Sequence, residues 1–379
     1  MKKIVILTSS GGGGTLSAST ALEEYLKNDY KITTLHIFNT LLKPIDFCSV
    51  LTLKKYSCED IYNILIPRKC FRALTALYHV GSWYIQLRKK RIYAALRRYF
   101  TVHRPDLIIS VVPILNNIIL SVAQDLNIPF LLIPTDLDVR MYLMNITQPA
   151  YKKFYIGIPF ADNQLTAPLK NASISDNHIT VIGAPLKHTF FLKKDISLLK
   201  KEFCIPENKP VIMLIMGAQG SYDLKKYAQQ LFKITTPIHI IICTGKNNKP
   251  FVYHTYDHIS VTTIQFTSRI ADLMELSDII ITKSGSLSVC EAIYMNTPLI
   301  LDATTTILPW ERFNHDFVKT HKIGTSITHY ADITRIITNL LETPHLLSVY
   351  KNNLQKLQKK NIEIEIKKCI VKIINPAVF

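Results

Sequence analysis

The chain has few cysteines, and no two of them stand at the C-x-x-C spacing. The seven are scattered over the sequence, at Cys48, Cys58, Cys70, Cys204, Cys243, Cys290 and Cys369. An odd, scattered set indicates no disulfide framework and lacks the paired spacing of a structural zinc site. We therefore expect a protein of a reducing compartment.

A long apolar run is also missing. Only four apolar residues stand between the N-terminal lysines and Thr8, too few for the apolar region of a signal peptide. Residues 107–123 are interrupted by one proline and two asparagines, and fall short of the ~18–20 apolar residues that a bilayer span needs. We expect a cytoplasmic protein without a transmembrane helix.

Acidic residues are scarce, with 28 Asp and Glu against 45 Lys and Arg and a formal net charge of +17. Between positions 68 and 98 there are nine Lys or Arg and no acidic residue. Aromatic and aliphatic residues share this segment at roughly helical spacing. Such a helix is typical of proteins that bind an anionic membrane surface, and the candidate contacts are Arg88, Lys89, Lys90 and Arg91.

Two other interpretations of the basic segment stay open. Its apolar stripe can face the protein core, as in most amphipathic helices. Nucleic acid is the third option, but no zinc finger, RNP strand or helix-turn-helix pattern accompanies the charge. We therefore expect no nucleic-acid partner.

The 379 residues are 48% hydrophobic, which is enough for two cored domains and excludes a mainly disordered chain. Short β-branched runs alternate with helical patterns, in the order typical of parallel sheets covered on both faces. Strands are predicted at 4–7, 32–37, 107–111, 130–133, 154–156 and 180–182, and then at 211–216, 238–243, 260–264, 279–282 and 299–301. We expect an α/β protein with two doubly wound, Rossmann-like domains facing a cleft, at 1–192 and 210–379. The charged segment 193–209 is the predicted linker, and a C-terminal helix near 354–374 is expected to return toward the first domain.

Glycine turns follow the first predicted strand of each half. Gly11, Gly12, Gly13 and Gly14 let backbone N–H groups approach an anion at a helix N-terminus, which favours a phosphate site. The alternative is a tight strand-to-helix turn without a ligand. The second turn runs from Gly217 through Ala218, Gln219 and Gly220 to Ser221.

The densest group of polar residues lies between positions 266 and 317. Residues 279–282 predict a strand that ends in a Ser-Gly-Ser turn, and a helix with Glu291 about two turns in. The N–H groups of such a turn can hold a diphosphate, and a carboxylate beside it can accept both hydroxyls of a ribose. A solvated glutamate is the alternative for Glu291.

These motifs together resemble the processive diacylglycerol glycosyltransferases and plant-type monogalactosyldiacylglycerol synthases of glycosyltransferase family 28. The resemblance covers nearly the whole chain. It is carried by residues 8–22, P-D-L-I-I at 105–109, P-T-D at 134–136, G-A-P at 183–185, M-G-A-Q-G at 216–220, C-T-G-K-N at 243–247, the segment 277–292, and Glu311 with Asn314.

The resemblance implies the GT-B fold and an inverting transfer of a hexose from a UDP-sugar to diacylglycerol or a glycosylated form of it. The expected location is the cytoplasmic side of the membrane, with the enzyme bound peripherally to its inner face. By resemblance, Phe266 and Thr267 would lie beside the uracil, and Glu291 on the ribose. The diphosphate would be bound by Gly285, Ser286 and Ser288, and the sugar would lie near Trp310, Glu311 and Asn314. The remaining residues of the expected donor site are Gly217, Gln219, Gly220 and Lys246. No cofactor or metal is expected, since no D-x-D motif accompanies the donor turn.

The acceptor turn departs from the family pattern. Relatives carry a histidine where this chain has Thr15, and a threonine hydroxyl cannot act as a base near neutral pH. Asp136 is then the best candidate for the catalytic base, with Asp138 behind it and His188 third. Two alternatives remain: the lipid-linked peptidoglycan N-acetylglucosaminyltransferase of the same superfamily, and a non-catalytic protein that binds UDP-sugar or anionic lipid.

Overall fold

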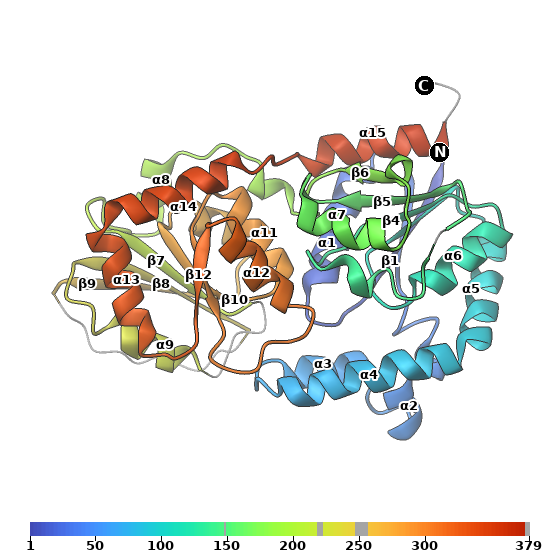
Figure 1. The fold of residues 1–379 in the computed structure, drawn as a ribbon, viewed down its shortest axis with the longest axis horizontal. Helices are drawn as coiled ribbons and strands as arrows, with labels where there is room; N and C mark the ends of the chain where they lie inside the picture. Colours follow the sequence, from blue (N-terminus) through green and yellow to red (C-terminus); the bar gives the residue numbers. More distant parts are fainter. Residues whose placement is uncertain (148, 218–222, 247–256, 376–379) are drawn as a thin grey trace. The chain divides into compact units, whose positions relative to one another are not determined.

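The computed structural model describes residues 1–147, 149–217, 223–246 and 257–375, which form two compact units (Figure 1). The first unit comprises Met1–Leu65, Arg72–His188 and the chain from Gln358 on. The second comprises Ile66–Phe71 and Thr189–Leu357. Each unit has its own parallel sheet and its own hydrophobic core, which confirms the predicted α/β class.

The sheet of the first unit has the strand order β2-β1-β3-β4-β5-β6. Its strands are β1 (Lys3–Thr8), β2 (Lys31–His36), β3 (Leu107–Ser110), β4 (Phe130–Leu132), β5 (Phe154–Ile158) and β6 (Ile179–Val181). Strands β1, β3 and β4 are buried almost throughout, because helices cover both faces of a parallel sheet. The chain order reverses between β1 and β3, and such a switch point is where doubly wound sheets bind ligands.

The helices of the first unit are α1 (Gly14–Leu26), α2 (Phe47–Leu51), α3 (Cys58–Leu65), α4 (Phe71–Leu87), α5 (Lys89–His103), α6 (Asn116–Asp125), α7 (Asn163–Asn171) and α15 (Ile362–Ile374). Of these, α2 to α5 are inserted between β2 and β3. Short 3-10 turns lie at Lys43–Ile45, Val139–Met141, Asp176–His178 and His188–Phe190. The last helix, α15, runs beside α1 of the first unit, and Lys367 pairs there with Asp29 at 2.9 Å.

The sheet of the second unit has the order β12-β11-β10-β7-β8-β9, which is the strand order of the dinucleotide-binding folds. Its strands are β7 (Val211–Ile215), β8 (Ile238–Gly245), β9 (Ile259–Gln265), β10 (Ile279–Lys283), β11 (Leu299–Asp302) and β12 (Gly324–Ile327). Its helices are α8 (Ile196–Glu202), α9 (Leu224–Leu231), α10 (Ile270–Glu275), α11 (Ser286–Tyr294), α12 (Arg312–Thr320), α13 (Asp332–Glu342) and α14 (Pro344–Lys356). The order reverses between β7 and β10.

Two elements differ from the prediction. The edge strand β12 was not predicted, because it is short and mostly polar. A Cβ on its Gly324 would clash with the Leu299 carbonyl oxygen, so the close approach of β11 requires glycine. The basic segment is two helices, α4 and α5, joined at Arg88. In α5 the apolar stripe faces the core through Ile92 and Leu96, as the second interpretation proposed.

The extents of the two units also differ from the predicted domains. The second unit begins at Thr189, and most of the predicted linker 193–209 is taken up by α8 and its flanks. The segment Ile66–Phe71 belongs to the second unit, because the ammonium of Lys69 pairs there with Asp302 at 2.8 Å and with Asp223 at 3.4 Å. Burial opposes the charged form of each group, yet the opposite charges raise the pKa of Lys69 and lower that of Asp302.

A buried histidine in β8 makes the second unit sensitive to acid. Burial lowers the pKa of His239 to about 4, and the Lys209 charge adds to the effect, whereas an unfolded histidine titrates near 6.5. Between these pH values only the unfolded chain takes up the proton, so native stability falls as the pH falls through this window. We expect the unfolding equilibrium constant to rise by up to about tenfold per pH unit from this group. Wild type and His239→Gln are unfolded in urea at pH 7.5 and at pH 5. The free energy of unfolding should change less between these pH values in the variant. An equal change in both proteins would contradict the assignment.

Candidate functional site

The switch point of the second sheet brings two glycine turns against one lysine. Gly217 follows β7 with a φ of +80°, and a Cβ there would lie 2.8 Å from Cε of Lys283. A Cβ on Gly285, after β10, would lie 3.2 Å from the same carbon. The Lys283 side chain therefore lies between the two turns, and residues larger than glycine would displace it.

The turn after β10 is held by side chains from the start of α12. The Ser284 hydroxyl donates to Glu311 Oε2 at 3.0 Å, and the Asn314 amide donates to the Ser284 carbonyl at 2.5 Å and to Ser286 Oγ at 2.9 Å. All four side chains are buried. Their bonds fix the direction in which α11 begins, and the free N–H groups of a helix N-terminus form an anion site.

Other predicted donor residues lie at the carboxyl ends of neighbouring strands. The Phe266 ring follows β9, is 59% exposed, and has the Lys246 ammonium 5.3 Å from its centroid. Thr267 accepts a hydrogen bond from the Arg269 N–H at 3.1 Å. An exposed ring with a cation over one face leaves area on which a base can stack.

The remaining donor predictions divide into three groups. Ser288 and Glu291 are half-buried on α11, and Trp310 is buried just before α12. Gln219 and Gly220 lie outside the described residues. Glu311 and Asn314, expected near the sugar, contact the turn, because buried polar groups must be hydrogen-bonded and the turn supplies their partners.

Lys283 was not among the predicted site residues. Its signal in the sequence is its position as the last residue of β10, directly before Ser284 and Gly285. Strand residues alternate between faces, so the sequence alone does not indicate that its side chain crosses toward Gly217.

In the first unit, the glycine turn after β1 is held by α3. The Gly12 N–H donates to Asn63 Oδ1 at 2.9 Å, and the Ser10 N–H donates to Glu59 Oε1 at 2.9 Å. Gly12 and Gly13 have φ of +80° and +95°, a conformation that favours glycine. Open space lies where Cβ atoms of Gly13 and Gly14 would be, so that side of the turn is not filled by side chains.

Glu59 is a buried carboxyl group that sequence reasoning missed. It also accepts from the Ser9 hydroxyl at 2.5 Å and from the Asn39 amide at 2.6 Å. Burial raises the pKa of Glu59, against the lowering effect of the bonds from Ser9 and Ser10. Glu59 is 50 residues from Ser9 in the sequence, so no local pattern indicates that it binds the glycine turn.

Parallel pairing of β1 and β2 brings a histidine to the same turn. His36 is opposite Thr8 in the register, and its Nδ1 lies 3.1 Å from Ser10 Oγ. Thr15, at the position of the missing histidine, donates its hydroxyl to the Ser9 carbonyl at 2.8 Å. Thr15 therefore ties the start of α1 to the end of β1, while His36 supplies an imidazole from another strand.

The three acceptor-side candidates have different surroundings. Asp136, half-buried after β4, accepts a hydrogen bond from the Tyr142 hydroxyl at 2.8 Å. Burial and the Asp136 charge raise the pKa of Tyr142, so this phenol stays a donor. Asp138 is buried and bound at 2.7 Å by both Nε and Nη2 of Arg140, and His188 pairs with Glu363 at 2.7 Å. Asp136 is the half-buried candidate, and its carboxylate is bound by a phenol hydroxyl.

Comparison with known proteins agrees with these two sheets. Residues 211–306 match the glycosyltransferase family 28 C-terminal domain. The processive diacylglycerol beta-glucosyltransferase of Bacillus pumilus is 22% identical over 373 residues, 95% of this chain and 92% of that protein.

Solved structures show the same fold. MurG of Acinetobacter baumannii superposes with a TM-score of 0.64 at 13% identity, covering 98% of this chain and all of that one. UGT2 of Phytolacca americana, solved with UDP-2-fluoro-glucose and pterostilbene, has a TM-score of 0.60 at 12% identity over 98% of this chain and 100% of that chain. The chain is thus a glycosyltransferase of the GT-B fold, and residues 211–306 of its second unit match the C-terminal domain of glycosyltransferase family 28.

Proposed function

We propose that this chain transfers a hexose, with inversion, from a UDP-sugar to diacylglycerol or a glycosylated diacylglycerol. The observation that carries the proposal is the group formed by Gly217, Lys283 and Gly285 at the switch point of the second sheet. It lies in the segment that matches family 28, and the relatives named diacylglycerol glucosyltransferases support the acceptor.

The donor site offers cationic and dipolar groups to a leaving diphosphate. Negative charge builds up on UDP as its bond to the sugar breaks. The N-terminus of α11 and the Lys283 ammonium would stabilise that charge without a metal ion, because both are fixed before the reaction. Glu291 would accept the ribose hydroxyls, and the uracil would stack on Phe266.

Asp136 is our proposed base. It would take the proton from the acceptor hydroxyl as the hydroxyl oxygen attacks the anomeric carbon, and UDP would leave with the bonding electrons. The Tyr142 hydroxyl donates to Asp136 Oδ2 and would orient the carboxylate for this step. His36 is the second side chain at this edge with an acid–base group.

An anionic membrane surface is the proposed location of the acceptor, on the inner face. Helix α4 exposes Trp83 at 63% and Leu87 at 61%, and Lys89, Lys90 and Arg91 are exposed at the start of α5. Apolar side chains flanked by cations suit the boundary between headgroups and acyl chains. In the described part of the chain no helix is both long and apolar enough to cross a bilayer.

The second candidate function is N-acetylglucosamine transfer to a lipid-linked peptidoglycan precursor. The similarity to the fold of A. baumannii MurG favours it, although a fold match at 13% identity does not distinguish acceptors. A protein that binds UDP-sugar without turnover is the third.

One assay separates the three. Purified protein is incubated with vesicles that contain diacylglycerol or lipid I and with single UDP-sugars, and both UDP release and new glycolipid are measured. We expect UDP release that depends on diacylglycerol, and a loss of about 10²–10⁴ in turnover for Asp136→Asn, the usual contribution of a positioned base. His188→Gln tests the third candidate, and we expect it to keep activity because this imidazole pairs with Glu363.

Dependence on lipid I would support the second function, and UDP binding without transfer the third. If Asp136→Asn keeps full activity and His36→Gln loses it, His36 is the base and the proposed mechanism is wrong.

Removal of the Lys283 charge should weaken UDP binding. Lys283→Met keeps the aliphatic stem against Gly217 but removes the ammonium, so charge-assisted bonds of about 1.5–3 kcal/mol are lost. We expect UDP affinity to fall by about 10–150-fold in calorimetry. Lys319→Met, on the exposed side of α12, is the control. An unchanged affinity in the folded variant would exclude Lys283 from the site.

Reversal of the exposed charges at the start of α5 should release the protein from anionic vesicles. Lys89, Lys90 and Arg91 are changed together to Glu, and Arg88 is kept because it lies over the Tyr84 ring. Each cation near the surface contributes about 1 kcal/mol, so vesicle affinity should fall more than about 100-fold while UDP affinity is kept.

The control reverses three exposed lysines of the second unit, Lys319, Lys322 and Lys356, which gives the same net charge. Equal loss of vesicle binding in both variants would mean that net charge, and not this surface, governs binding. Vesicle binding of the wild type that does not depend on salt concentration would contradict an electrostatic contact.

A further inference from the structure

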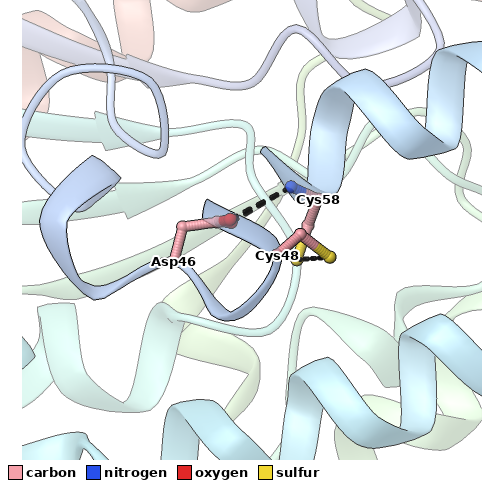
Figure 2. A group of neighbouring side chains, drawn as sticks. All are labelled: Asp46, Cys48 and Cys58. Atoms are coloured by element: carbon pink, nitrogen blue, oxygen red, sulfur yellow. Dashed lines mark hydrogen bonds between the residues drawn. The ribbon is translucent and has the colours of Figure 1, made fainter. Parts of the chain in front are cut away.

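Two cysteines that are ten residues apart meet between α2 and α3. The Sγ atoms of Cys48 and Cys58 lie 3.0 Å apart, and Figure 2 shows the two thiols side by side. Cys48 is 4% exposed and Cys58 is half-buried. Their spacing in the sequence does not indicate this contact, which depends on how the chain folds back between α2 and α3.

Asp46 fixes the backbone around this pair. Its Oδ1 accepts from the Ser49 N–H at 2.7 Å and from the Cys58 N–H at 3.2 Å, so one carboxylate caps the starts of both helices (Figure 2). The two thiols are thereby held together before any reaction. Pre-ordered groups close a bond with little further loss of chain entropy.

A metal ion is a weaker interpretation of the same group. Asp46, Cys48 and Cys58 are the three ligand-type residues gathered here, and among the described residues no fourth His, Cys, Asp or Glu joins them. A structural zinc site takes four ligands. The carboxylate is already engaged by two backbone N–H groups, which leaves the sulfur pair as the reactive part.

Cys58 is adjacent in sequence to Glu59, which binds the glycine turn after β1. Cys58 begins α3, and the next residue, Glu59, binds Ser9 and Ser10, while Asn63 on the same helix binds Gly12. The position of α3 therefore sets the geometry of the turn after β1. A bond at Cys58 would restrict that helix at its first residue.

We propose that Cys48 and Cys58 form a reversible disulfide that fixes α3 and, through Glu59 and Asn63, rigidifies the glycine turn. The oxidant is a small disulfide such as oxidised glutathione. A thiolate of the pair attacks it, one reduced thiol leaves, and the partner thiolate displaces the second. Two protein thiols become one S–S bond, and the oxidant becomes two thiols.

The surroundings make this reaction slow at neutral pH. Burial raises the pKa of both thiols, and the Asp46 charge adds to it. Because the thiolate is the nucleophile, the rate should rise about tenfold per pH unit over the neutral range.

The test uses the whole chain with Cys70→Ser and Cys204→Ser, which removes the two fully exposed thiols. It is equilibrated with mixtures of reduced and oxidised glutathione, free thiols are alkylated, and peptides are identified by mass. We expect a Cys48–Cys58 linkage that dithiothreitol reverses. Amide hydrogen exchange over residues 9–14 should slow about tenfold in the oxidised form, and Cys48→Ala should show no response to the glutathione ratio.

Three results would overturn the proposal. In the first, both thiols are still alkylated after equilibration with oxidised glutathione. In the second, zinc protects both thiols from alkylation and no disulfide forms. Alternatively the linkage forms and exchange over residues 9–14 is the same in both states, in which case the bond does not reach the turn.

Discussion

The parallel pairing of β10 with β7 is the constraint on which the proposed donor site depends. Residues far apart in sequence, Gly217 and Lys283, meet because the register places Ile215 opposite Thr282 and ends both strands at one edge. The α11 N-terminus then begins at that edge. A one-residue slip would turn every side chain of β10 to the other face and remove the lysine from the turn.

Both units support their glycine turn in the same way, with a carboxylate and an amide on a separate helix. In the first unit these are Glu59 and Asn63 on α3, and in the second Glu311 and Asn314 at the start of α12. Such pairs lie on one side of a helix, at a spacing of three or four residues. They bind the turn through side chains and backbone, which restricts its conformation.

Buried charges elsewhere in the structure are paired or neutral. Lys69 is bound by Asp302 and Asp223, and His239 stays uncharged because burial disfavours its cation. Isolated buried charges would be costly. Lys89, Lys90 and Arg91 at the start of α5 follow the opposite rule, since they are exposed and available to an anionic surface.

The sequence by itself determined the fold class, most strands and the glycine turns of the second unit, because buried parallel strands and glycine turns leave local patterns. Gly217, Gly285 and Ser286 were predicted from these patterns. Glu59, His36, Lys283 and the Cys48–Cys58 contact were decided by tertiary structure alone. Each depends on which strand or helix lies next to which. That adjacency is set by sheet order and packing between distant segments, and no local pattern along the chain records it.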